Sequence, residues 1–328
     1  MTESLYKSQR HSFLVKFAGK DMSEMYTTTK IILDDAVKNH YAVIASAAVN
    51  LELARGEIAA ADELQSPLII LLGQGQMSKH GSADLMTPMI KRLAEKTNVP
   101  VALILDHGRN WKYITHAFRN GFSSIMIDAS AYGMEENIAR TRKVVELCHS
   151  QGVAVEGEIG HVGQAAEMDG IKENLYTRPE DAEKFVAATH VDCLAIACGT
   201  AHGKYPKGFV PKLNFDIIRS VRAKIDTPLA LHGGSGSGSE NIRKAVEAGI
   251  NKVNVCTDIF DYCRDFTRKA LNQNPNYDYL QLLIEIEAKA KEITKRYISL
   301  TGSAGKAANF GPLNTFREDA GVYMGEGE

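Results

Sequence analysis

The sequence has few cysteines, no long apolar run and almost no net charge. Its five cysteines, in 328 residues and without a Cys-x-x-Cys pair, exclude a disulfide framework and a zinc ribbon. No uncharged apolar stretch reaches the roughly 18 residues of a membrane-spanning helix, and the polar start has no signal-peptide core. The formal net charge of −2 gives no overall field to attract nucleic acid or an anionic membrane. We therefore expect a soluble, cytoplasmic globular protein without nucleic-acid or membrane partners.

Short apolar runs alternate with longer stretches of helical period along most of the chain. Such strands and helices in alternation indicate a parallel sheet that is covered on both faces. Eight units in this length predict an α/β fold, the (β/α)8 or TIM barrel. An open doubly wound sheet is the alternative, but the GxGxxG that usually follows its first strand is absent here. The eight predicted strands are Tyr41–Ala45, Pro67–Leu72, Val101–Leu105, Ser123–Ile127, Val153–Val155, Cys193–Ala197, Pro228–Leu231 and Lys252–Val255.

The segments outside the repeat divide the chain into three parts. We predict an N-terminal extension with a short helix over residues 1–26 and a barrel over residues 27–301 that includes a C-terminal helix. Helical period from Tyr277 to about Leu300 supports that last helix. Residues 302–328, rich in Gly, Ala and Asn, are predicted to form a flexible tail. Inside the barrel, Thr177–Glu180 (TRPE) is typical of a capping box with Thr177 as the N-cap.

Reactive side chains collect where the predicted strands end, which is where a (β/α)8 barrel places its active site. Histidines follow the third, sixth and seventh strands, as His107, His202 and His232. Three neutral imidazoles that converge on one point are typical of a catalytic zinc with an open position for substrate. Taken singly, each histidine has the alternative of being a hydrogen-bonded core residue. Beside a metal, Asp106 and Glu158 would be suited to proton transfer or to supporting the ligands.

Glycine-rich turns follow the last two strands. In a barrel, the loops after strands seven and eight often present backbone N–H groups to a phosphate, and HGGSGSGS lies at the first of these places. Ser235 and Thr257 would add hydroxyl donors. The alternative for this segment is a flexible linker.

The motifs LDHG, MIDAS, VEGEIG, GTAHG, HGGSG and NVCTD, in this order and spacing, resemble the class II, zinc-dependent fructose- and tagatose-bisphosphate aldolases. The resemblance covers roughly Tyr41 to Asp258. It implies a Zn²⁺ site, with Co²⁺ or Mn²⁺ as substitutes and a monovalent cation as a further candidate. The implied zinc ligands are His107, His202 and His232, and the implied acid/base at the cleaved bond is Asp106.

Further roles follow from the same resemblance. Glu158 and Asp128 would lie near alternative metal positions, and Glu167 would handle the carbon-bound proton. The residues implied to bind the ketone half of the substrate and its phosphate are Gly203, Gly233, Ser235, Asn254 and Thr257. Cleavage leaves electrons beside a ketone, which either a Schiff-base lysine or a metal can stabilise. Lys252 opens its strand, at the end away from the site, so the three histidines favour the metal route.

Several substrate-contacting positions depart from the family pattern. The changes are Ser46-Ala47 for Phe-Asn, Gly73 for serine, Pro206 (flanked by Lys204 and Lys207) for lysine, Cys256 for an acidic residue or alanine, and Leu280 for an arginine that reaches into the neighbouring subunit. Arg109 is a gain, which we interpret as a cation for an anionic substrate end; a solvated arginine at a helix start is the alternative.

Together these residues predict a homo-oligomeric carbon–carbon lyase. It would cleave a ketose to dihydroxyacetone or its phosphate plus an aldehyde, and the departures favour a substrate other than fructose 1,6-bisphosphate. The leading candidate is 6-deoxy-6-sulfofructose. The alternatives are a fructose- or tagatose-bisphosphate aldolase and a non-catalytic barrel subunit of an aldolase complex.

Overall fold

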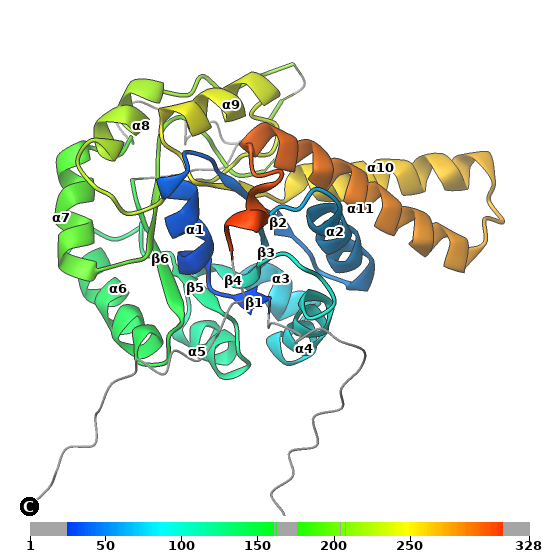
Figure 1. Cartoon of the computed structure of the whole chain (residues 1–328), viewed down its shortest axis with the longest axis horizontal. Helices are drawn as coiled ribbons and strands as arrows, with labels where there is room; N and C mark the ends of the chain where they lie inside the picture. The colour runs from blue at the N-terminus through cyan, green and yellow to red at the C-terminus, as the bar shows by residue number, and fades with distance from the viewer. Residues whose placement is uncertain (1–24, 161, 163–175, 204, 207, 311–328) are drawn as a thin grey trace, which may run out of the picture.

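Eight parallel strands close into a barrel surrounded by helices (Figure 1). The structure, a computed structural model, describes residues 25–160, 162, 176–203, 205–206 and 208–310. The strands pair in the order β4-β3-β2-β9-β8-β7-β6-β5, and β5 pairs with β4 to complete the circle. This confirms the (β/α)8 barrel, and each predicted strand overlaps an observed one. The barrel strands are β2 (Val43–Ala47), β3 (Leu68–Gly73), β4 (Val101–Gly108), β5 (Ser124–Ile127), β6 (Ala154–Ile159), β7 (Cys193–Ile196), β8 (Leu229–Leu231) and β9 (Lys252–Val255).

Helices connect the strands on the outside of the barrel. They are α2 (Leu51–Glu63), α3 (Gln74–Lys79), α4 (Ala83–Ala94), α5 (Trp111–Arg119), α6 (Met134–His149), α7 (Pro179–Thr189), α8 (Phe215–Arg222), α9 (Ser239–Ala248) and α10 (Thr257–Gln273). The predicted last helix is confirmed as α11 (Tyr279–Thr301), which lies beside α10 and projects with it from the barrel (Figure 1). The short 3₁₀ helix η2 (Lys306–Asn309) follows. Among the described residues, every helix is too short or too polar to cross a lipid bilayer.

The first described elements close the amino-terminal end of the barrel. The two-residue strand β1 (Tyr26–Thr27), which the sequence pattern did not predict, pairs with the start of β4. Helix α1 (Thr29–Lys38) places Ile32 and Leu33 among the side chains that fill the barrel. The predicted extension and tail lie largely outside the described residues, and their boundaries stay predictions.

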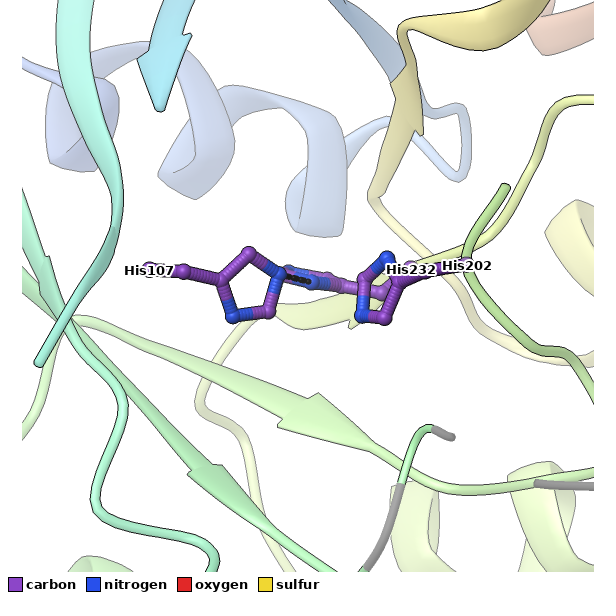
Figure 2. A group of neighbouring side chains, drawn as sticks. All are labelled: His107, His202 and His232. Atoms are coloured by element: carbon purple, nitrogen blue, oxygen red, sulfur yellow. Dashed lines mark hydrogen bonds between the residues drawn. The ribbon is translucent and has the colours of Figure 1, made fainter. Parts of the chain in front are cut away.

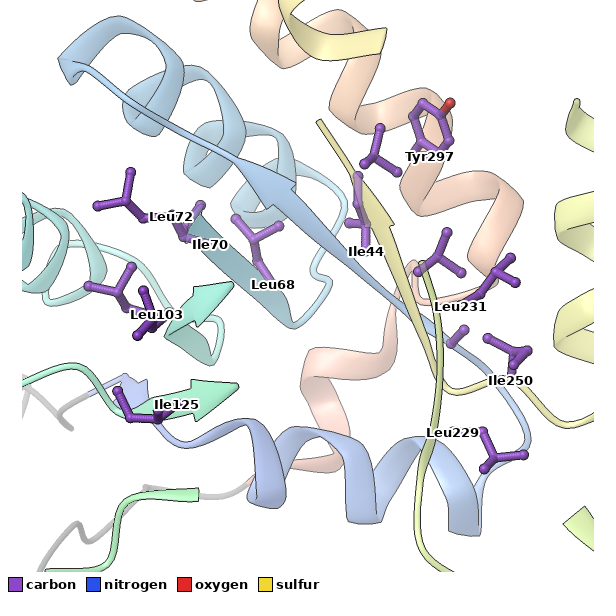
Figure 3. Close-up of a cluster of buried hydrophobic side chains, with 14 of the residues drawn as sticks. Ile44, Leu68, Ile70, Leu72, Leu103, Ile125, Leu229, Leu231, Ile250 and Tyr297 are labelled. Carbon is purple, nitrogen blue, oxygen red and sulfur yellow. The ribbon is translucent and has the colours of Figure 1, made fainter. Parts of the chain in front are cut away.

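Two apolar layers hold the barrel together because successive strand residues point to opposite faces. On β3, Leu68, Ile70 and Leu72 pack outward against the helices (Figure 3). Ile69 and Leu71 point into the barrel, where many of the neighbouring side chains are alanines. Burying a leucine or isoleucine contributes about 1.5–3 kcal/mol, so this alternation fixes the register of the strand.

The capping box predicted at Thr177–Glu180 is wrong. Helix α7 begins at Pro179, and its N-cap, Arg178, makes no side-chain capping bond. The Thr177 hydroxyl instead donates to the carbonyl oxygen of Ile159 at 3.0 Å and accepts from the amide of Ala197 at 2.9 Å. It therefore joins the ends of β6 and β7, a tertiary role that takes the hydroxyl away from the helix.

Candidate active site

An irregularity in β4 turns two consecutive reactive side chains toward the same place. Neighbouring residues of a regular strand point to opposite faces. The pairing of β4 with β5 shifts between Leu105 and Gly108, and His107 has a φ of 49°, in the left-handed region. As a result, Asp106 accepts a hydrogen bond from Asn254 Nδ2 at 2.9 Å while His107 also faces the mouth of the barrel.

The three histidines meet at the carboxyl ends of the strands (Figure 2). The ring centroid of His107 lies 4.6 Å from that of His202 and 4.8 Å from that of His232. Nε2 of His107 and Nδ1 of His232 are 3.1 Å apart. Two nitrogens bound to a tetrahedral Zn²⁺ at 2.0–2.1 Å lie about 3.3 Å from each other. This pair therefore has the spacing of two ligands of one metal ion.

Carboxylates fix the orientation of two of these rings. Nδ1 of His107 is 2.8 Å from Asp128 Oδ2, and Nε2 of His232 is 2.8 Å from Glu156 Oε1. Each hydrogen bond turns the other ring nitrogen toward the gap between the histidines, where Nε2 of His107 and Nδ1 of His232 lie within hydrogen-bond distance of each other. Glu156 had no predicted role, although its position two residues before Glu158 on β6 indicates that both buried side chains point to the same side of the strand.

A buried ion pair lies beneath His232. The Nζ atom of Lys252 is 2.7 Å from Glu156 Oε2, and both side chains are fully buried. Lys252 opens β9 at the end away from the site, as predicted, but its long stem reaches the carboxylate that holds His232. Lys252 supplies the positive charge that balances the buried carboxylate of Glu156.

The surrounding carboxylates shift the pKa values of the histidine cluster. Burial alone would lower the pKa of His107, but the charges of the neighbouring carboxylates, Asp106 foremost, raise it to about 9. Burial, together with the charges of His107 and His232, holds the pKa of His202 well below its usual value. Burial would raise the pKa of Asp128, yet its hydrogen bond to His107 holds that pKa well below its ordinary range. A cation between the rings would neutralise this surplus of negative charge.

The unpaired carboxylate oxygen of Glu158 also supports a cation at this place. Oε2 of Glu158 is buried and has no hydrogen-bond partner among the described residues. It lies 3.8 Å from Nδ1 of His107 and 3.9 Å from Nδ1 of His232, and burial raises the pKa of Glu158. His107, Asp128 and Glu158 form a second group that could hold an ion. Imidazole and carboxylate donors in this arrangement fit Zn²⁺.

The glycine-rich loop after β8 packs against the segment that carries His202. Gly233 has a φ of 66°, and a Cβ there would lie 2.4 Å from the carbonyl oxygen of Ala201, so no other residue fits. Ser235 Oγ accepts from the amides of Cys256 and Asp258 at 3.2 and 3.1 Å.

The other predicted substrate-binding residues lie around this loop. Asn254 on β9 also approaches His232, and Thr257 is the first residue of α10. Gly203 follows His202 and is exposed. Glu167, assigned to the carbon-bound proton, lies outside the described residues.

Arg109 is paired with a carboxylate of the same chain. Its Nε and Nη2 atoms lie 2.8 and 2.7 Å from Asp128 Oδ2, the oxygen that also faces His107. The guanidinium-bearing side chain is nevertheless 63% exposed and lines the cavity described next. Arg109 thus supports Asp128 in addition to any role toward substrate.

A cavity of about 810 Å³ opens above the histidines. This volume lies within the range of small-molecule sites. One wall consists of the end of β3, helix α3 and His80, which follows the helix. The other wall carries Asp106, His107 and His202. The polar residues of the first wall, Gln74, Gln76, Lys79 and His80, were not predicted. The GQGQ segment was interpreted only as the loss of a hydroxyl.

Comparison with known proteins places these features in a family. The model of the family described as "Fructose-bisphosphate aldolase class-II" matches residues 27–306. The YdjI protein of Escherichia coli (strain K12) is 38% identical over 84% of this chain and 96% of its own length. The fructose-bisphosphate aldolase of Geobacillus stearothermophilus is 38% identical over 85% of this chain and 98% of its own. The crystal structure of the E. coli YdjI aldolase superposes with a TM-score of 0.75 at 35% identity, over 86% of this chain and 99% of that one.

Proposed function

The chain belongs to the class II fructose-bisphosphate aldolase family, and on this basis we propose that it is a metal-dependent lyase that cleaves a ketose to dihydroxyacetone or its phosphate plus an aldehyde. The family and the fold support a retro-aldol lyase. The observation that carries the proposal further is that the three imidazoles converge, and that two of them, His107 and His202, line one cavity together with Asp106.

His107, His202 and His232 would hold Zn²⁺, with Co²⁺ or Mn²⁺ as substitutes. The bound metal would act as a Lewis acid that stabilises the electrons left beside the ketone. Asp128 and Glu156 orient two of the imidazoles toward the gap. The unpaired oxygen of Glu158 lies close enough to support an alternative position of the ion.

Asp106 is assigned the proton transfer at the cleaved bond. Its carboxylate takes the proton of the substrate hydroxyl as the carbon–carbon bond breaks and the aldehyde forms. Asn254 holds Oδ1 of Asp106, which leaves Oδ2 available for this step. Glu167 would then return a proton to the carbon of the ketone half. Gly203, Gly233, Ser235, Asn254 and Thr257 would bind that half and its phosphate.

The preferred ketose is proposed to carry one anionic end other than the second phosphate of fructose 1,6-bisphosphate, as in 6-deoxy-6-sulfofructose. Gly73 offers no hydroxyl in the cavity, and Leu280, in the first turn of α11, is 65% exposed and uncharged. In a cytoplasmic homodimer or larger homo-oligomer, Leu280 would stand where an arginine of the neighbouring subunit is usual. Cleavage of fructose 1,6-bisphosphate is the alternative, favoured by the name of the Geobacillus relative.

The metal requirement is the first test. Purified protein should contain bound zinc, a chelator should abolish ketose cleavage, and Zn²⁺ should restore it. Full activity after chelation, or borohydride trapping of a lysine–substrate adduct, would refute the metal mechanism.

A panel of ketoses tests the substrate. It should include fructose 1,6-bisphosphate, tagatose 1,6-bisphosphate, 6-deoxy-6-sulfofructose and the unphosphorylated sugars, with release of aldehyde as the readout. The highest kcat/KM for fructose 1,6-bisphosphate would refute the substrate proposal and leave the lyase intact. Cleavage of no ketose by the zinc-loaded protein would support a non-catalytic subunit.

A further inference from the structure

We propose that Lys79, with His80 beside it, anchors an oxyanion at the end of the ligand remote from the cleaved bond. The proposal rests on the proposed function only in taking the histidine end of the cavity as the place of chemistry. It assigns the remote end to α3, for which the sequence predicted only the loss of a serine hydroxyl at Gly73.

The exposed fractions of the side chains show which residues lie deep in the cavity and which lie at its rim. The His232 side chain is fully buried and that of His107 is 17% exposed, whereas Lys79 and His80 are exposed. All but His232 line the same cavity of about 810 Å³. A ligand whose reacting carbons lie at the histidines therefore extends its other end toward Lys79.

Lys79 brings a positive charge to the wall of the cavity. Its ammonium group has no carboxylate partner in the part of the chain that the structure describes. Arg109, the other strong cation on the cavity wall, is paired with Asp128. Of the described residues that line the cavity, Asp106 alone is a carboxylate, and it accepts a hydrogen bond from Asn254. An incoming anion is thus the natural partner of Lys79.

Two glutamines hold α3 in place before any ligand arrives. Gln74 Oε1 accepts from the backbone amides of Arg109 and Asn110, each at 2.9 Å, and this joins α3 to the end of β4. Gln76 Oε1 accepts from the amide of Gly73 at 2.7 Å, and its Nε2 donates to Cys256 Sγ at 3.3 Å. Lys79 therefore projects from a fixed platform, which reduces the ordering cost of binding.

The ligand class that fits is a sugar with an oxyanion at its far end. Phosphate, sulfonate and carboxylate share the chemistry that an ammonium and an imidazole recognise, and the amide side chains of Gln74 and Gln76 line the same cavity. Matched ligands that differ only in the terminal group can therefore distinguish these three sources.

The test measures binding without catalysis. Glucitol, glucitol 6-phosphate, its 6-sulfonate analogue and gluconate all lack the ketone or aldehyde that retro-aldol cleavage requires, so none of them can be cleaved. Their affinities are measured by calorimetry on zinc-loaded protein. Lys79→Gln should weaken the preferred anionic ligand by about five- to tenfold and leave neutral glucitol unchanged. The matched control is Lys96→Gln, an exposed lysine that precedes β4 at the opposite end of the barrel.

The dependence of affinity on salt gives an independent readout. The loss caused by Lys79→Gln should shrink as KCl rises from 50 to 500 mM, because screening weakens the charge contact in the wild type. Equal affinities of wild type and Lys79→Gln, or no preference for anionic over neutral hexitols, would overturn the proposal. Because no ligand is cleaved, absent aldolase activity would count against the proposed function alone.

Discussion

Among the individual side chains of the site, Asp106 is the one whose replacement should largely abolish catalysis without affecting metal binding. Asp106→Asn keeps the shape of the side chain but cannot accept the hydroxyl proton, so kcat should fall about 10²–10⁴-fold while bound zinc and the melting temperature stay near normal. Steady-state kinetics and metal analysis on the same sample check this. Near-normal turnover would show that another group, such as Glu158, moves the proton.

Glu156 is the residue that should control how well His232 binds metal. Removing its charge in Glu156→Gln loosens the orientation of the ring and leaves Lys252 buried without a carboxylate. Zinc affinity, measured by competition with a chromogenic chelator, should fall about 10–100-fold.

A double variant distinguishes this positioning role from simple misfolding. Adding Lys252→Met removes the unpaired buried cation, so the double variant should regain thermal stability but not zinc affinity. Recovery of both properties would contradict a role for Glu156 in orienting His232.

Among the strands, the end of β4 is the feature on which the geometry of the site depends. A Cβ at Gly108 would lie 2.7 Å from the carbonyl oxygen of Met126, so Gly108→Ala should force β4 away from β5. We expect a loss of about 1–3 kcal/mol in stability and a larger relative loss of zinc affinity. Denaturant titration and metal competition measure the two effects. Gly133→Ala, whose Cβ would meet no atom within 4 Å, is the control.

The elements that the sequence predicted are those fixed by local pattern. The eight apolar runs were sufficient to predict the barrel. The rule that reactive residues follow strand ends was sufficient to predict that His107, His202 and His232 converge, as they do in the structure. The bonds that orient these rings join residues far apart in sequence: His232 is 76 positions from Glu156, and Glu156 is 96 from Lys252. No spacing rule predicts such pairs.

The wrong capping box and the unpredicted α3 wall have the same cause. Thr177 has the residue type of an N-cap, but two strand ends compete for its hydroxyl. Gln74 and Gln76 became informative only when their partners on the neighbouring segments were known. A local sequence preference does not determine the structure where a tertiary contact uses the same atom.

The overall stability of the fold should depend on pH through Glu57. This residue of α2 is fully buried, and neither carboxyl oxygen has a hydrogen-bond partner among the described residues. Burial raises the pKa of Glu57 to about 8, offset only in part by the neighbouring Ser46 hydroxyl. The thiols of Cys256 and Cys263 also lie in its field, and they provide no positive charge.

The sign of the effect follows from proton binding. Between about pH 4.3, where an unfolded glutamate titrates, and pH 8, the folded state keeps a proton on Glu57 that the unfolded state has lost. The free energy of unfolding should therefore fall as pH rises through this window, by up to about 3–4 kcal/mol between pH 5 and 8 from this group alone. Glu57→Gln, which cannot ionise, should remove that contribution and be more stable than wild type at pH 8. Urea titrations at several pH values measure the difference, with Glu52→Gln on the first turn of the same helix as the control. A Glu57→Gln curve parallel to that of the wild type would show that Glu57 is already ionised in the folded protein between pH 5 and 8, and would contradict the raised pKa.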